Sequence, residues 1–73
     1  MTKPLSLPLF CAPSPDRDDA LAVQIYRDLL AAIRAGRLDR GARLPSSRAA
    51  AAELGVARST VNTAYDLLRA EGA

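Results

Sequence analysis

The chain has 73 residues, a net charge of +2, one cysteine and no histidine. A single cysteine cannot form an internal disulfide, and this inventory offers no cluster of metal ligands. With three aromatic residues in so short a chain, a large catalytic cavity is hard to build. No stretch is long enough to span a membrane. These limits leave room for one small domain at most.

Residues 1–18 hold four of the five prolines and predict an extended or disordered leader outside the core. Leu5, Leu7 and Leu9 alternate with Ser and Pro, so a short edge strand is an alternative. The apolar run is too short and the basic region too thin for a secretory signal peptide, and we expect a reduced, cytoplasmic setting. Cys11 has no histidine to accompany it and is expected to be inert.

A first helix is predicted over residues 19–35. Asp18 or Asp19 can cap its start, where a negative charge also suits the helix dipole. Gly36 follows the last turn and can adopt the left-handed conformation that ends many helices. The apolar residues repeat at helical spacing and predict a buried face at Ala22, Ile25, Leu29, Ala32 and Ile33.

The connector after this helix, residues 37–45, lies in a basic region. From residue 27 to residue 48, six arginines stand against two aspartates, which suggests contacts with phosphate groups. A solvated helix face followed by a loop is the alternative explanation. The Asp-Arg-Gly run at 39–41 predicts a turn, and residues 43–44 are a candidate for a very short strand.

A second, short helix is predicted at residues 47–54. Ser46 or Ser47 can cap its start, and Gly55 can end it. Its middle consists of alanine, which has the highest helix propensity and a small side chain, so this helix can pack close to its neighbours. A tight Gly-Val turn then leads to the third helix.

The third predicted helix, residues 58–71 with Gly72 as its terminator, carries the most informative pattern. Its apolar residues, spaced by four and then three, predict a buried seam at Val61, Tyr65 and Leu68. The opposite face is polar and holds Ser59, Asn62, Thr63 and Asp66. A helix with a buried seam, a short polar face and an Arg-Ser-Thr start has what is needed to enter the major groove of DNA.

A longer pattern runs through residues 36–72. Its defining residues are Gly36, Leu38, Gly41, Leu44-Pro45-Ser46, Arg48, Leu54-Gly55-Val56, Arg58, Thr60-Val61 and Ala70-Glu71-Gly72. With the first helix included, residues 20–72 resemble the DNA-binding head of the GntR family of bacterial transcription regulators. The resemblance implies an all-α three-helix core of a winged helix-turn-helix domain over residues 19–73. It also implies a DNA-binding transcription factor that places the helix at 58–71 in the major groove.

The resemblance and the helical geometry together indicate which side chains meet double-stranded DNA. They are Arg48, Arg58, Ser59, Thr60 and Asn62. Arg48 is expected to reach a phosphate or a guanine edge, and Arg58 and Ser59 base edges or nearby phosphates. Thr60 is expected to bind phosphate through its hydroxyl and the helix-end amides. Asn62 is expected to read a base, adenine being its best partner.

Each of these residues also has a plainer explanation. In the alternative explanation, Arg48 is a surface residue that pairs with a carboxylate. In the same way, the alternative for Ser59 and Thr60 is that they are ordinary residues of a helix start. The alternative for Asn62 is that its amide is solvated and reads no base. The tyrosines are expected to pack in the fold rather than to stack on bases.

Within the family, Pro-Ser-Ser-Arg at 45–48 and Thr-Ala-Tyr at 63–65 are most similar to the MocR branch. In that branch an aminotransferase-like domain that binds pyridoxal phosphate follows the head. The resemblance therefore implies a homodimeric parent whose small-molecule effector binds a domain beyond this chain. A pyridoxal phosphate-dependent enzyme with a DNA-binding appendage is an alternative, although no histidine, glycine-rich phosphate loop or carboxylate pair here supports catalysis.

Three features depart from the family pattern. Ala49 and Ala50 stand where Glu and Leu are frequent, so the capping box with Ser46 is lost. Ala57 stands where Ser or Thr usually caps the recognition helix, a loss of about 1 kcal/mol. The family continues beyond residue 73 into a two-stranded wing. We therefore expect a head with the wing missing, and a non-functional fragment is a further alternative.

Overall fold

The computed structural model describes residues 6–16, 19–39 and 43–72. Within these ranges the chain forms three α-helices, one turn of 3-10 helix and no strand. The elements are η1 (Leu7–Leu9), α1 (Leu21–Arg34), α2 (Ser47–Leu54) and α3 (Arg58–Ala70). The expected three-helix, all-helical architecture is confirmed, whereas the candidate strands at residues 43–44 and around Leu7 do not form.

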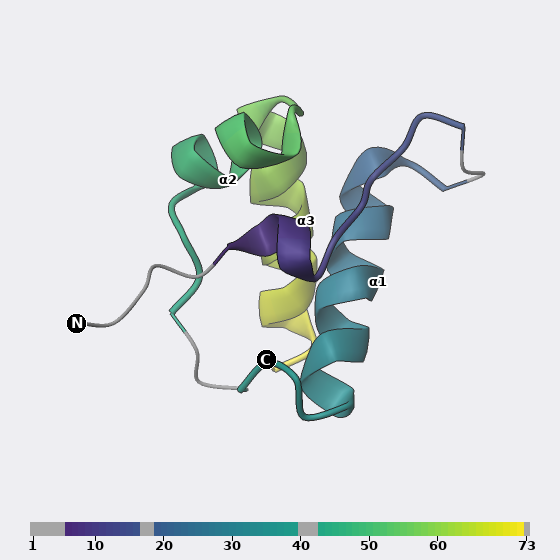
Figure 1. Ribbon diagram of the computed structural model, residues 1–73, viewed down its shortest axis with the longest axis vertical. Coiled ribbons are helices and arrows are strands. Elements are labelled where there is room, and N and C mark those ends of the chain that lie inside the picture. The colour runs from purple at the N-terminus through teal and green to yellow at the C-terminus, as the bar shows by residue number, and fades with distance from the viewer. Residues whose placement is uncertain (1–5, 17–18, 40–42, 73) are drawn as a thin grey trace.

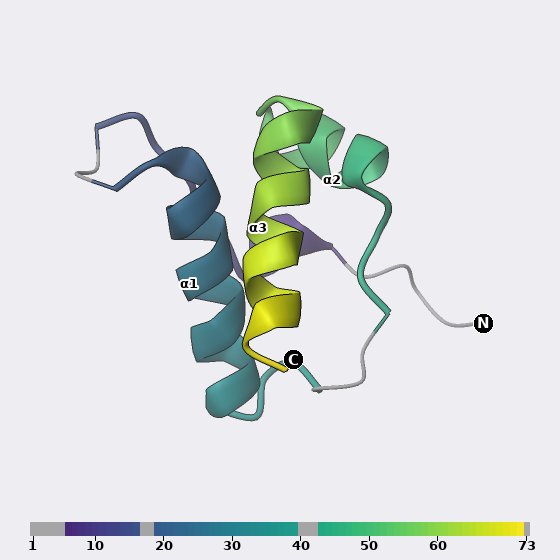
Figure 2. The same ribbon diagram turned by 180° about the vertical axis from the view of Figure 1, so that it is seen from behind.

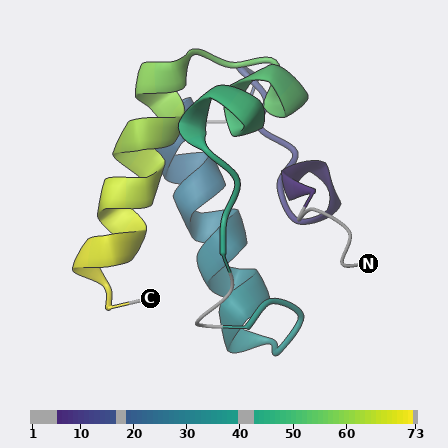
Figure 3. The ribbon, with the colours of Figure 1, turned by 90° about the vertical axis from the view of Figure 1, so that its left-hand side faces the viewer.

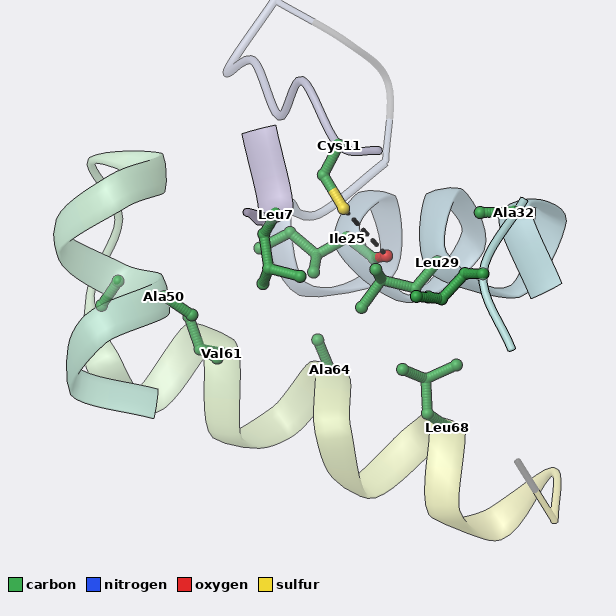
Figure 4. Packing of buried hydrophobic residues seen from close by; sticks show 11 residues of the cluster. Leu7, Cys11, Ile25, Leu29, Ala32, Ala50, Val61, Ala64 and Leu68 are labelled. Carbon is green, nitrogen blue, oxygen red and sulfur yellow. Dashed lines mark hydrogen bonds between the residues drawn. The ribbon is translucent and has the colours of Figure 1, made fainter. Parts of the chain in front are cut away.

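α1 and α3 lie side by side and run in the same direction (Figures 1 and 2), and α2 lies across the end at which α3 begins (Figure 3). The core lies between them (Figure 4). Its members from the helices are Ile25, Leu29, Ala32, Ala50, Ala51, Val61, Ala64 and Leu68. The predicted seams of α1 and α3 are confirmed, although Ala22, Ile33 and Tyr65 are only partly buried. None of the helices in the described ranges has the length and apolar character needed to cross a membrane.

The start of α1 differs from the prediction. The N-cap residue is Ala20, and no side chain caps the helix. Asp19, one of the two predicted caps, instead forms an ion pair with Arg27 at 2.6 Å between carboxylate and guanidinium, and Asp18 lies outside the described residues. The carboxylate is thus committed to a side chain two turns into the helix. The end of α1 follows the prediction, with Gly36 just beyond it at a φ of +77°.

The ends of α2 are those that its sequence predicts. The hydroxyl of Ser46 accepts a hydrogen bond from the backbone N–H of Ala49 at 3.2 Å. Gly55 ends the helix with a φ of +69°, where any side chain would meet a steric penalty. α3 begins after Ala57, which has no side chain to cap it. It is one residue shorter than predicted and is followed by Gly72 at a φ of +82°.

The described part of the leader, residues 6–16, belongs to the fold, which differs from the expectation that residues 1–18 lie outside the core. Leu7 is fully buried and Cys11 is 4% exposed. One 3-10 turn brings both side chains to the same side, where they contact the helices (Figure 4). The thiol of Cys11 donates a hydrogen bond to the carbonyl oxygen of Ile25 at 3.9 Å. The proposed domain boundary after residue 18 stays a prediction.

Gln24 and Arg37 are among the polar side chains that attach the leader to the rest of the chain. Gln24, buried in α1, binds the backbone of Ser14. Arg37 donates to the carbonyl oxygen of Leu9 at 3.3 Å, and its guanidinium carbon lies 5.6 Å from the centre of the Phe10 ring. These contacts join residues that are distant in sequence, so no local pattern predicts them.

Candidate nucleic-acid interface

α3 has one buried and one exposed face. Val61, Ala64 and Leu68 are buried against the rest of the fold. The polar side chains that this helix exposes are Arg58, Ser59, Asn62, Thr63, Asp66 and Arg69. In Figure 2, α3 lies in front of the rest of the molecule, and no other described element covers it. The predicted division of this helix into a seam and a polar face is confirmed.

Three of the polar side chains on this face are used within the helix. The hydroxyl of Thr63 donates to the carbonyl oxygen of Ser59 at 3.0 Å. Asp66 forms an ion pair with Arg69 at 3.4 Å, and because both side chains are exposed the pair contributes little to stability. In the described part of the chain the side chains of Ser59 and Asn62 form no hydrogen bond. The hydroxyl and the amide are therefore available to a ligand.

Arg48 and Arg58 lie in the first turns of α2 and α3. Both are exposed, and neither forms an ion pair with a carboxylate of residues 6–16, 19–39 or 43–72. The explanation of Arg48 as half of a surface ion pair is therefore not realised in this structure. An unpaired guanidinium keeps its five N–H donors for a phosphate or a base edge.

The start of α3 is suited to a negatively charged group. Thr60 is half-buried, and its backbone N–H donates to the carbonyl oxygen of Ala57 at 3.1 Å. Because Ala57 offers no capping side chain, the amides before Thr60 have no acceptor from the cap residue. The helix dipole also favours an anion at this end.

An open groove of about 390 Å³ lies between the start of α2 and the middle of α3. It is lined by Leu44, Pro45, Ser46, Ser47, Asn62, Tyr65, Leu68 and Arg69. The hydroxyl of Tyr65 crosses it and donates to the carbonyl oxygen of Pro45 at 2.8 Å. Of these lining residues, the sequence had named Asn62 as a candidate for DNA contact, but not Ser47 or Arg69. The available signal was the spacing of seven residues between Asn62 and Arg69, which is about two helical turns and puts both on one face.

The basic region is less available to phosphate than its charge suggests. Arg27 is paired with Asp19, and Arg37 holds the leader. Two of the six arginines between residues 27 and 48 therefore already have a partner within the protein. The turn predicted at residues 39–41 lies mostly outside the described ranges.

Comparison with known proteins shows the family to which a chain with this surface belongs. The family model described as bacterial regulatory proteins, gntR family, matches residues 21–73. The chain belongs to the GntR family. It is therefore the DNA-binding domain of a GntR-type transcription regulator rather than a catalytic domain, and α2 and α3 form its helix-turn-helix.

Two curated regulators are similar to this GntR domain. The chain is 49% identical over 57 residues to the probable rhizopine catabolism regulatory protein MocR of Rhizobium meliloti. It is 40% identical over 55 residues to the uncharacterized HTH-type transcriptional regulator YdeL of Bacillus subtilis (strain 168). The alignments cover 78% and 75% of this chain but only 12% of either relative, so the GntR domain corresponds to a small part of each regulator. No solved structure matched the chain.

Proposed function

We propose that this GntR domain binds double-stranded DNA by placing α3 in the major groove. The observation that carries the proposal is the exposed surface of α3, where Arg58, Ser59 and Asn62 are accessible while Val61, Ala64 and Leu68 are buried. An α-helix fits the width of the major groove, and its side chains reach base edges there. The family assignment supports DNA as the partner.

The side chains divide by the chemistry that they offer. From the first turn of α2, Arg48 donates to a phosphate or to a guanine edge. Arg58 and Ser59 contact base edges or nearby phosphates, and Thr60 binds a phosphate together with the uncapped amides beside it. Asn62 offers the acceptor and donor pair that matches the edge of adenine.

For the full-length protein we propose a cytoplasmic regulator of the MocR type. Such a protein is a homodimer whose aminotransferase-like domain binds pyridoxal phosphate and whose small-molecule effector binds outside the head. The support is the MocR-like pattern at residues 45–48 and 63–65 and the 49% identity to MocR. The described residues contain no lysine that could hold pyridoxal phosphate covalently, so the cofactor would bind elsewhere.

Fluorescence anisotropy with a labelled duplex tests this interface. Arg48→Ala and Arg58→Ala are each expected to weaken binding, by about 1–3 kcal/mol where the side chain reads guanine. Arg27→Ala is the matched control because Arg27 is also an exposed arginine but is paired with Asp19, and it should leave the affinity unchanged. The isolated domain should bind non-specifically at about 10⁻⁴–10⁻⁶ M, and more weakly as salt rises.

The proposal fails if the Arg48→Ala and Arg58→Ala variants both bind the duplex with the same affinity as the Arg27→Ala control. Binding that does not depend on salt would also contradict it, because phosphate contacts release counterions. A cooperative thermal transition must be established first, since a partly folded fragment would not present α3 as a helix.

A further inference from the structure

A hydrogen bond from Tyr65 joins the two helices of the DNA-binding motif. The hydroxyl of this α3 residue donates to the carbonyl oxygen of Pro45 at 2.8 Å, across twenty residues of sequence. Pro45 stands directly before Ser46, the N-cap of α2, and Arg48 lies in the first turn of that helix. The bond therefore ties the start of α2 to the middle of α3.

The segment that receives this bond has little regular structure of its own. Residues 43–46 form neither helix nor strand, and Pro45 has no N–H to donate. The ring of Tyr65 packs against the core. Its burial, with Cys11 and Glu53 as further causes, raises the pKa of Tyr65 to about 12. The phenol therefore stays protonated, and remains a donor, throughout the neutral range.

We propose that Tyr65 is a positioning residue for DNA binding. Its bond to Pro45 fixes the start of α2 relative to α3, so that Arg48 meets a phosphate of the duplex whose base edges α3 contacts. This inference rests on the proposed function. It adds a residue that acts without touching DNA, because Tyr65 lies in the groove between the helices, half-buried, with its hydroxyl already bound to protein.

The test compares Tyr65→Phe with Arg48→Ala in binding to a short fluorescent duplex of mixed sequence. The association constant K falls as the salt concentration rises, and each lost phosphate contact lowers the magnitude of the slope of log K against log salt by about one. Arg48→Ala should lower the slope by this amount. Tyr65→Phe should do the same, because the arginine is no longer held at its phosphate. The double variant should show no further decrease, since both substitutions remove one and the same contact.

Tyr26→Phe is the matched control. It also removes a phenol hydroxyl, one that donates to a carboxylate oxygen of Glu71 at 2.7 Å beyond the end of α3. It should leave the salt slope unchanged. A merely structural role of Tyr65 would lower the unfolding temperature without changing the slope of the folded molecules, so every variant is measured well below its own unfolding transition.

The inference is overturned if Arg48→Ala lowers the slope while Tyr65→Phe does not, and the proposed function then still stands. It is also overturned if the effects of the two substitutions add. If Arg48→Ala leaves the slope unchanged, the phosphate role of Arg48 fails and the inference fails with it. Should Tyr65→Phe not fold, tetrafluorotyrosine at position 65 replaces it. The ring fluorines make this phenol more acidic than that of tyrosine, so raising the pH ionises it within the folded protein and must lower the magnitude of the slope by about one.

Discussion

The side-chain amide of Gln24 pairs with both backbone polar atoms of Ser14. The amide oxygen accepts from the N–H of Ser14 at 2.8 Å, and the amide nitrogen donates to the carbonyl oxygen of Ser14 at 2.8 Å and to that of Asp19 at 2.7 Å. Gln24 is fully buried, so these bonds replace the ones that its amide would make with water. They fix the end of the leader onto α1.

Gln24→Met should therefore destabilise the domain, although the side chain keeps about the same size. The backbone groups of Ser14 and Asp19 lose their partner, and the free energy of unfolding is expected to fall by about 1–3 kcal/mol in urea denaturation. Asn62→Met is the control because the Asn62 amide is exposed, and it should change stability by no more than about 0.5 kcal/mol. Equal stability of the two variants would mean that Gln24 does not hold the leader.

Two leucines of η1 test whether the leader belongs to the core. Leu7 is 0% exposed and Leu9 is 71% exposed. Leu7→Ala should lower the free energy of unfolding by about 2–5 kcal/mol because it leaves a cavity, a large share of the stability of a small domain. Leu9→Ala should have little effect. The check is thermal unfolding monitored by circular dichroism. If the two variants show small and similar effects, the leader does not belong to the core.

Substitutions at the N-caps of α2 and α3 should change the free energy of unfolding in opposite directions. Ala57→Ser supplies the side-chain acceptor that α3 lacks and should stabilise the domain by about 1 kcal/mol. Ser46→Ala removes the bond to the N–H of Ala49 and should destabilise it by a similar amount. Both are measured as midpoint shifts in urea. No gain from Ala57→Ser would show that the start of α3 is already satisfied by other contacts.

Because of Cys11, the folded domain should lose stability at alkaline pH. Burial, with Asp28 as the smaller cause, raises the pKa of the Cys11 thiol from 9.0 to about 12. The folded state keeps a proton that the unfolded state loses above pH 9.0. Stability is therefore complete below that pH and falls as the pH rises toward 12, by up to about 1.4 kcal/mol per unit.

Urea titrations on both sides of pH 9.0 measure this decline. Cys11→Ala should remove it up to the pH at which tyrosines, with an ordinary pKa of 10.0, begin to ionise. A decline of the same size in Cys11→Ala would assign the effect to other groups.

Features that depend on a few neighbouring residues were predictable from the sequence. Ser46 lies three residues before the amide that it caps, and Gly55 takes the left-handed conformation at the end of the same helix. The spacing of apolar residues within α3 separates its seam from its polar face. That spacing also placed Ser59 and Asn62 on the exposed side, because helical geometry is local.

Features that depend on tertiary packing were not predictable in this way. Leu7 sits in a proline-rich segment and is buried only because the helices meet beside it. Asp19 is a good cap by residue type, but Arg27 competes for its carboxylate. The bond between Tyr65 and Pro45 joins residues twenty positions apart, and no periodicity within α3 signals it.

The most direct test of the central claim, that the exposed face of α3 is the DNA-binding surface, is an NMR titration of the domain with a short duplex. Amide chemical shifts should change most at residues 47–48 and 58–63, in the first turns of α2 and α3. Residues of the leader and of the outer face of α1, such as Ala31 and Arg34, should change least. Changes concentrated on that face of α1, or no changes at all, would contradict the account.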